Sequence, residues 1–209
     1  MTLHAALTRE IDEGPSGSHI AAFFDLDRTL LAGFSAAHFI REDVLAGRMR
    51  AKHFAQTMMA AALFQLRQIG FSGFAASTME RLRDVPESEL ESQAEHMFLE
   101  HLAADVYPEA RALVQAHRRK GHTVAVVSSA TRYQIDPLAR DFGIEHVLCT
   151  QLEVKNGKFT GRVIKPTCYG EGKAIAARAF ATPRGIDLKE SYFYTDSDED
   201  LPLLEIVGK

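Results

Sequence analysis

The sequence predicts an α/β fold with a doubly wound, mainly parallel sheet, a β-hairpin and an inserted helical cap. Short apolar runs (IAAFFDLD, HTVAVVSS and SYFYTDSD) are continuous rather than alternating, as in strands that are buried on both faces of a parallel sheet. In the second half of the chain such runs alternate with helical patterns, which implies parallel strands joined by right-handed crossovers. A long segment of helical periodicity separates the first run from the second and is the predicted insertion.

Composition excludes several classes of protein. The chain has 209 residues, is 46% hydrophobic and 25% charged, and carries a net charge of −4. It has the size of one large domain and no basic excess for binding nucleic acid. No apolar run approaches the ~20 residues of a membrane helix, and the first residues lack the pattern of a signal peptide. Cys149 and Cys168 show no CxxC spacing, so we expect no disulfide framework, no zinc module and a cytoplasmic protein.

The predicted domains follow the changes in pattern along the chain. Residues 1–19 are expected to be a flexible lead-in, because the DEGPSGSH segment before the first strand is polar and rich in Gly, Pro and Ser. Residues 20–32 and 106–209 are expected to form the α/β core. Residues 33–105 show no strand pattern and are expected to form the helical cap.

Apolar residues of the expected cap recur at helical spacing: Phe54, Met58, Met59, Leu63, Leu66 and Ile69. We expect Met58, Met59, Leu63 and Phe64 to form the core of the cap rather than a substrate groove. The cap helices are also apolar enough to form a homodimer contact.

Beyond Tyr107 the expected elements are regular. Pro108 suits the first turn of a helix and Gly121 its end. The LEVKNGKFTGRVI segment alternates around Asn156-Gly157, which is a strong hairpin signal. The remaining expected elements are a strand over 146–149 and helices over 133–142, 171–181 and 200–207.

Polar residues follow three of the predicted strands. Asp25 and Asp27 end the first, Ser128 and Ser129 the second, and Asp196 the last, with Asp200 close behind. Ligand sites of open parallel sheets lie beyond the carboxyl ends of the strands, so these side chains are expected to converge. Two carboxylates ~4 Å apart repel by about 4 kcal/mol at an effective dielectric of 20. Such an oxygen-only cluster indicates a bound Mg²⁺ ion.

A site of this kind suits a phosphate group. The Ser128 hydroxyl and the backbone N–H groups that follow it could bind phosphate oxygens, and Lys173, at the start of a helix, could add its ammonium. Asp25 as nucleophile, with Asp27 as general acid and then general base, gives a two-step mechanism through an aspartyl phosphate.

The motifs DLDRTL, VVSSA, GEGK and YTDSDED, in that order, resemble the four motifs of the haloacid dehalogenase (HAD) superfamily of phosphohydrolases. The resemblance extends from about residue 20 to 208 and implies a HAD-like core. The insertion between the first two motifs resembles the small helical cap of the subclass that includes phosphoserine phosphatase. Relatives that cleave carbon–halogen bonds lack an acid at the Asp27 position, so the resemblance implies an Mg²⁺-dependent phosphatase.

The resemblance also implies a role for each motif residue. Asp25 is the expected nucleophile and a metal ligand, and Asp27 is the acid/base with its carbonyl on the metal. Asp196 is expected to ligate Mg²⁺. Asp200 acts beside it, directly, through water or by orienting Lys173. The expected phosphate-binding residues are Ser128, Ser129 and Lys173.

Two positions depart from the family pattern. Arg28 places a bulky cation where many relatives have glycine. Phe34 stands where phosphoserine phosphatases have an acid that reads the substrate amine, which favours a substrate with an apolar contact over phosphoserine. Both are candidate specificity residues. The FFDLDRTLLAGF and SYFYTDSDED segments also resemble HAD domains fused to glycerophospholipid acyltransferases.

Several alternatives stay open from the sequence. The chain is either a phosphatase acting on a small phosphorylated metabolite, a phosphatase module of phospholipid metabolism that is fused to or partnered with an acyltransferase, or a catalytically silent phosphate-binding or interaction domain. Transfer of the phosphoryl group to a second alcohol uses the same residues as hydrolysis. The histidines, His117 and His146 among them, lack metal-ligand spacing and are expected to be structural or surface residues.

Overall fold

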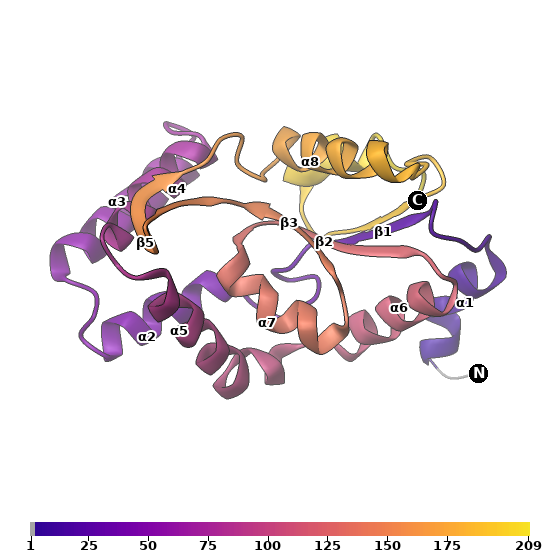
Figure 1. The fold of residues 1–209 in the computed structure, drawn as a ribbon, viewed down its shortest axis with the longest axis horizontal. Coiled ribbons are helices and arrows are strands. Elements are labelled where there is room, and N and C mark those ends of the chain that lie inside the picture. Colours follow the sequence, from indigo (N-terminus) through magenta and orange to yellow (C-terminus); the bar gives the residue numbers. More distant parts are fainter. Residues whose placement is uncertain (1–2) are drawn as a thin grey trace.

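The structure is a computed structural model that describes residues 3–209, with side chains from residue 6 onward (Figure 1). Its central sheet has four parallel strands in the order β3-β2-β1-β6. These strands are β1 (Ala21–Phe24), β2 (Thr123–Thr131), β3 (His146–Thr150) and β6 (Tyr192–Tyr194). The predicted parallel α/β fold is confirmed, and β1 lies between two neighbours.

Helices cover both faces of this sheet (Figure 1). Helix α8 (Glu171–Ala181) lies on one face, and α6 (Pro108–Arg119) and α7 (Arg132–Phe142) lie on the other. Successive side chains of β1 alternate between the two layers, so Phe24 packs on the α6–α7 side and Phe23 on the α8 side. Because both faces are covered, β1 is buried throughout, as its unbroken apolar sequence predicts.

The segment between β1 and α6 is helical, as predicted. Four α-helices form it, and they gather at the end of the molecule away from both termini (Figure 1). They are α2 (Ser35–Leu45), α3 (Ala51–Gln65), α4 (Phe71–Met79) and α5 (Glu87–Glu100), with short 3₁₀ turns at Glu80–Leu82 and Leu102–Asp105. The helical insert is thereby confirmed, while the exact division into core and cap stays a prediction.

The predicted hairpin forms around Asn156-Gly157. It joins β4 (Leu152–Lys155) to β5 (Lys158–Val163) as an antiparallel pair apart from the central sheet. Asn156 and Gly157 have φ angles of 52° and 71°, the left-handed conformations that a tight hairpin turn requires. The hairpin packs against α4, and the Gly157 carbonyl accepts a hydrogen bond from the Glu87 N–H, so it braces the helical insert.

The expectation of a flexible lead-in is wrong for most of residues 1–19. Helix α1 spans Leu3–Glu13 and packs against α6. Ile11 is 2% exposed, and Thr8 is buried one turn before it. The physical reason is the spacing of these two residues, which puts them on one inward face of a helix. Polar Asp12 stays near the surface and pairs with Arg119.

Other boundaries differ by a few residues. Helix α7 begins at Arg132, because the preceding residue caps it, and the last helix, α9, is confined to Leu201–Leu204. A 3₁₀ turn, Asp198–Asp200, precedes α9, and another, Thr182–Arg184, follows α8. No helix of residues 3–209 is long and apolar enough to span a membrane.

The expectation that Met58 and Met59 form the core of the cap is wrong. Their exposed fractions are 54% and 62%. Helix α3 buries Thr57 and Ala60 instead, and Phe64 is half-buried against the rings of α4. The apolar periodicity of α3 correctly predicts a helix. Its apolar residues nevertheless lie on both the buried and the exposed face, so the periodicity does not identify the buried one.

A buried chain of hydrogen-bonded rings underlies β1 and β6. His117 Nδ1 lies 2.8 Å from His122 Nδ1, and His117 Nε2 lies 2.9 Å from the Tyr194 hydroxyl. His122 Nε2 must donate to the Pro15 carbonyl at 3.0 Å, so His122 Nδ1 accepts, His117 Nδ1 donates, and Tyr194 donates to His117 Nε2. Burial lowers the pKa of His117 to about 3, so this ring is neutral and structural, as expected.

Candidate active site

The sheet topology brings the predicted strand ends together. Asp25 directly follows β1, which lies between β2 and β6, and its N–H donates to the Tyr194 carbonyl at 3.0 Å. Ser128 lies near the end of β2, and Asp196 follows β6 by two residues. Since all of these strands are parallel, their carboxyl ends share one edge of the sheet.

Lys173 is the centre of a buried ionic cluster at this edge. Its Nζ lies 2.9 Å from Asp25 Oδ1 and 2.7 Å from Asp200 Oδ2. The exposed fractions of Lys173, Asp25 and Asp200 are 3%, 8% and 2%. Burial alone would lower the pKa of Lys173, but the two carboxylates outweigh it and raise that pKa above its ordinary value. The ammonium is therefore charged near neutral pH and lies against the expected nucleophile.

The start of α8 places Lys173. Gly170 precedes the helix with a φ of 54°, a conformation that favours glycine. Gly172 allows close packing of the helix on the preceding loop, since a Cβ there would lie only 1.9 Å from the Thr167 carbonyl oxygen. The glycines of the GEGK motif thus bring the lysine close to the sheet.

Two donors converge on one carboxylate oxygen of Asp200. In addition to Lys173, the Thr195 hydroxyl donates to Asp200 Oδ2 at 2.6 Å. Thr195 also accepts a hydrogen bond from the Ser197 N–H. Of the three roles that the sequence allows for Asp200, this geometry favours the orientation of Lys173. Thr195 was not among the predicted site residues.

Asp27 is held by the start of the helical insert. Its Oδ1 accepts a 2.7 Å hydrogen bond from the Ser35 N–H, and burial raises its pKa above the ordinary value. The Gln134 side-chain amide in turn donates to the Ser35 hydroxyl at 3.0 Å. Gln134 also closes a capping box with Thr131. A Thr-x-x-Gln pattern is a recognisable helix start, so the sequence contains a signal for Gln134 but none for Ser35.

The two serines of the second motif are placed differently. Ser128 is 2% exposed, and its Oγ accepts a 3.3 Å hydrogen bond from the Ala130 N–H. Ser129 is half-buried. The register between β2 and β3 shifts after Ser128, so the backbone here departs from the regular strand ladder.

Asp196 lies on the more exposed side of the site, where it pairs with Arg28. Arg28 Nη2 is 3.1 Å from Asp196 Oδ2, and the Arg28 guanidinium carbon lies 5.8 Å from the centre of the Phe34 ring. Phe34 is 57% exposed. Arg28 has a φ of 61°, an uncommon conformation for a residue with a side chain. Both candidate specificity residues thus lie together at the rim of the site.

The residues of this edge match the ligand chemistry of Mg²⁺. Asp25 Oδ1 is buried and accepts no hydrogen bond of good geometry, despite its ion pair with Lys173. An orphaned carboxylate oxygen beside further oxygen donors fits a hard cation. In the described part of the chain, however, no three His, Cys, Asp or Glu side chains form a group ready to hold a metal, and Asp196 is turned to Arg28.

The helical insert contacts the loop that leads into α8. The Tyr169 ring stacks on Phe71 with centroids 4.5 Å apart, and the Ser72 and Thr167 hydroxyls are 2.9 Å apart. Phe64 also lies against Tyr169. A movement of the insert would therefore also displace the first turn of α8, which contains Lys173.

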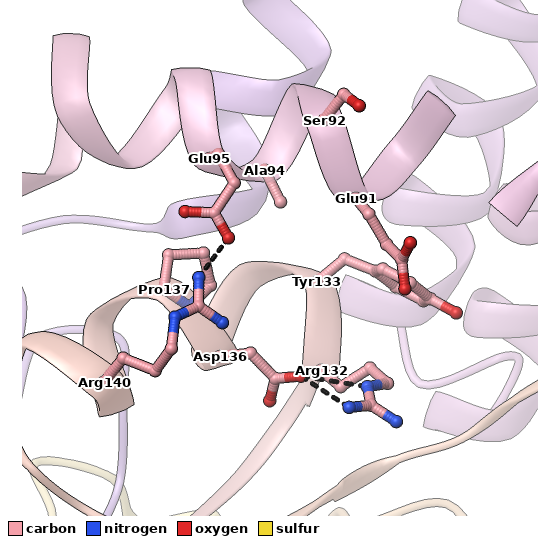
Figure 2. Close-up of a pocket in the computed structure, with 9 residues that line it drawn as sticks. All are labelled: Glu91, Ser92, Ala94, Glu95, Arg132, Tyr133, Asp136, Pro137 and Arg140. Carbon is pink, nitrogen blue, oxygen red and sulfur yellow. Dashed lines mark hydrogen bonds and ion pairs between the residues drawn. The ribbon is translucent and has the colours of Figure 1, made fainter. Parts of the chain in front are cut away.

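A separate surface cavity of about 340 Å³ lies between α5 and α7 (Figure 2). Its charged side chains pair with one another: Arg132 with Asp136 at 2.8 Å, and Arg140 with Glu95. None of its lining residues is a predicted site residue. Among the described residues that line the cavity, these two ion pairs leave Glu91 as the one charged residue outside an ion pair, and a single carboxylate is no site, so we assign the cavity no chemistry.

The cysteines also show no sign of chemistry. Cys149 and Cys168 are free and buried. Burial raises the pKa of the Cys149 thiol to about 11 and that of Cys168 to about 12, so both are protonated near neutral pH.

Comparison with known proteins identifies the family to which the chain belongs. The sequence matches the haloacid dehalogenase-like hydrolase family over residues 22–205. It is 35% identical over 198 residues to a probable phosphatase of Mycobacterium tuberculosis, covering 90% of this chain and 66% of that protein. It is 34% identical over 193 residues to a phosphoserine phosphatase of the same species, covering 90% and 62%. The chain thus spans less than two thirds of the length of these curated relatives.

A solved structure is similar over nearly the whole chain. It is a protein of unknown function from Bordetella pertussis Tohama I, with a TM-score of 0.83 and 26% identity over 92% of this chain and 88% of that one. The similarity confirms the sheet, the helical insert and the hairpin as one known architecture. Together with the match over residues 22–205, it shows that this chain belongs to the haloacid dehalogenase-like hydrolase family.

Proposed function

We propose that this protein is a phosphatase that hydrolyses a phosphomonoester through a covalent phosphoryl intermediate on Asp25. The observation that supports the proposal most directly is the Lys173 ammonium, 2.9 Å from Asp25 and 2.7 Å from Asp200 at the edge where the strands end. A nucleophilic carboxylate meets repulsion from a phosphate dianion, and a fixed buried cation beside it offsets that repulsion.

In the first step, an Asp25 carboxylate oxygen attacks the phosphorus and the bond from phosphorus to the leaving oxygen breaks. Asp27 transfers its proton to that oxygen, so the alcohol leaves neutral. The raised pKa of Asp27 suits this role, because a general acid must hold its proton until the transition state. The Ser35 N–H and the Gln134 side chain keep the Asp27 carboxyl in place.

In the second step, Asp27 acts as a base. It takes a proton from a water molecule whose oxygen attacks the phosphorus, and the bond between phosphorus and Asp25 breaks. Inorganic phosphate leaves, and Asp27 is again protonated. Throughout, Lys173 and the groups around Ser128 bind the equatorial oxygens of the phosphoryl group, and Asp200 and Thr195 orient Lys173.

We propose Asp25, Asp196 and the Asp27 backbone carbonyl as the residues that would hold Mg²⁺. The ion supplies Lewis-acid neutralisation of charge on the phosphoryl oxygens when bound. Asp200 is better placed as the partner of Lys173 than as a ligand, since two donors already occupy its Oδ2. Arg28 would compete with the ion for Asp196, because its Nη2 lies 3.1 Å from Asp196 Oδ2.

We propose that the leaving group contacts Phe34 and Arg28. Phe34 is 57% exposed at the rim of the site. The guanidinium carbon of Arg28 lies 5.8 Å from the centre of the Phe34 ring. This pairing favours an alcohol with an apolar part over the small zwitterionic serine. Phe34→Ala is expected to raise KM for an aromatic phosphomonoester while leaving KM for phosphoserine almost unchanged. An equal effect on both substrates would argue against contact with the leaving group.

The test of the reaction class is release of p-nitrophenol from p-nitrophenyl phosphate, with Mg²⁺ or with EDTA, by the wild type and Asp25→Asn. We expect release that needs Mg²⁺ and is lost in Asp25→Asn. Release that persists in a folded Asp25→Asn variant would refute Asp25 as the nucleophile. A folded wild type that shows no turnover on a broad phosphomonoester panel would favour the silent phosphate-binding alternative.

Four finer predictions belong with this proposal. Adding an alcohol acceptor and measuring new phosphoester separates hydrolysis from phosphoryl transfer. The link to an acyltransferase, fused or as a partner, stays a prediction, and a further domain of that type in the parent gene would favour it. A cytoplasmic location and a small phosphorylated metabolite as substrate also stay predictions.

A further inference from the structure

Helix α3 exposes apolar side chains that a helix ordinarily buries. Thr57 and Ala60 are its buried residues, whereas Met58, Met59 and the following Leu66 are 54%, 62% and 68% exposed. A surface helix normally has the opposite arrangement, with its apolar stripe toward the core. We call the exposed residues Phe54, Met58, Met59 and Leu66 the outer face of α3.

Exposed apolar side chains are concentrated around this helix. Among the described residues, fourteen large apolar side chains are exposed, and six of them lie between residues 44 and 66: Val44, Leu45, Phe54, Met58, Met59 and Leu66. Scattered exposed apolar residues are ordinary, whereas six within 23 consecutive residues, four of them on α3 and its C-cap, mark a candidate interaction surface. Figure 1 shows α2 and α3 at the end of the molecule away from both termini.

The same segment has an unusual charge. Residues 44–79 contain no Asp or Glu, although an even spread of the 28 acidic residues would place about five there. Their basic residues are Arg48, Arg50, Lys52 and Arg67, so this segment is net +4 and the rest of the chain is net −8. In the described part of the chain, Arg48 pairs with acids of α2, but Arg50, Lys52 and Arg67 have no acidic partner within 4.0 Å.

The unpaired cations lie at both ends of α3. Arg50 caps its N-terminus and Lys52 lies in the first turn, where the helix dipole disfavours positive charge. Arg67 follows the C-terminal end. The dipole favours Arg67 at this end, but Arg50 and Lys52 do not serve the stability of the helix, so an anionic partner outside the chain accounts for these two better.

The charge distribution favours an anionic lipid surface over a second copy of the chain. A symmetric dimer through the outer face of α3 would bring together two sets of cations that lack an acidic partner among the described residues, Arg50, Lys52 and Arg67 of each copy. A lipid surface instead attracts the basic segment and repels the acidic remainder, which orients the molecule. Flexible methionine and leucine side chains also suit a fluid apolar layer.

We propose that α3 docks on an anionic lipid surface. Its outer face would enter the boundary between headgroups and acyl chains, and the cations at its two ends would lie against the headgroup phosphates. This surface is distinct from the catalytic edge of the sheet. Phe64 and Phe71 of the insert contact Tyr169, which lies in the loop before Lys173. A shift of the insert on lipid binding would therefore also move this loop.

The test is flotation of the purified protein with vesicles of phosphatidylcholine alone or of phosphatidylcholine mixed with phosphatidylglycerol. We expect flotation with the mixed vesicles, decreasing with added salt, and little with phosphatidylcholine alone. Replacing Arg50→Gln and Lys52→Gln together is expected to weaken binding about thirtyfold. The pair Met58→Ser and Met59→Ser is expected to abolish it.

Leu99→Ser serves as the matched control, because Leu99 is 71% exposed but lies on the acidic helix α5. It should bind as the wild type does. Failure of the wild type to float with anionic vesicles would overturn the proposal, as would equal binding of the Met58/Met59 variant. A dimer in solution that the same variant dissociates would assign the face to a second copy instead. None of these results depends on turnover, so the proposed phosphatase activity is tested separately.

Discussion

Replacement of Lys173 by methionine tests how much the ionic cluster contributes to the stability of the protein. Methionine has nearly the same length but no charge, so Asp25 and Asp200 would be left buried and unpaired. Each lies less than 3 Å from Lys173 Nζ, where the Coulomb attraction is ~6 kcal/mol at an effective dielectric of 20. Most of this attraction offsets the desolvation of three charges. The expected net loss of unfolding free energy is about 3–5 kcal/mol.

Urea unfolding of wild type, Lys173→Met, Asp200→Asn and the double variant measures this loss. We expect the double variant to be more stable than Lys173→Met, because it removes one of the stranded carboxylates. The difference between wild type and Lys173→Met should also shrink at acidic pH, where the stranded carboxylates become protonated. A Lys173→Met protein within about 1 kcal/mol of the wild type would refute the reasoning, because surface ion pairs contribute that little.

The remaining predictions concern packing, pH and metal affinity. Gly172→Ala places a Cβ 1.9 Å from the Thr167 carbonyl oxygen, so it should cost about 1–3 kcal/mol in thermal unfolding and lower kcat; an unchanged Tm and kcat would contradict the packing argument. The pKa of His117 falls from 6.5 to about 3 on folding, so the unfolded chain binds an extra proton between these values. Stability should therefore fall as pH drops below about 6.5, by at most about 1.4 kcal/mol per pH unit, and His117→Gln should flatten that slope in urea titrations. An equal slope in the variant would assign the acid sensitivity elsewhere. Arg28→Ala frees Asp196 and should tighten Mg²⁺ binding in calorimetry up to about fivefold, whereas weaker binding would show that Arg28 supports the metal site.

The sheet, and the edge at which the candidate site lies, were predictable from the sequence. Continuous apolar runs identify buried parallel strands, and polar residues directly after them must share one edge once the strands are parallel. Asp25 and Lys173 are 148 residues apart in the chain and form an ion pair in the structure. The turn at Asn156-Gly157 was equally predictable, because few residues adopt two successive left-handed conformations.

Supporting contacts were harder to predict. Ser35 binds Asp27 through its backbone N–H, a contact that any residue type could make and that no side-chain pattern reveals. The pairing of Arg28 with Asp196 depends on an unusual φ angle at Arg28. Periodicity predicted that α3 is a helix but not which face is buried, because Met58 and Met59 are apolar and nevertheless exposed.

The central claim is that a phosphoryl group is transferred to Asp25, and intact-mass spectrometry after acid quenching tests it most directly. Asp27→Asn removes the base of the second step but keeps an oxygen for the Ser35 N–H, so the intermediate should accumulate on mixing with Mg²⁺ and p-nitrophenyl phosphate. We predict one added phosphoryl group, mapped by peptide analysis to Asp25 and absent when Asp25→Asn is added. A phosphoryl group on another residue, or turnover by the wild type with no trapped phosphoryl group in Asp27→Asn, would contradict the account.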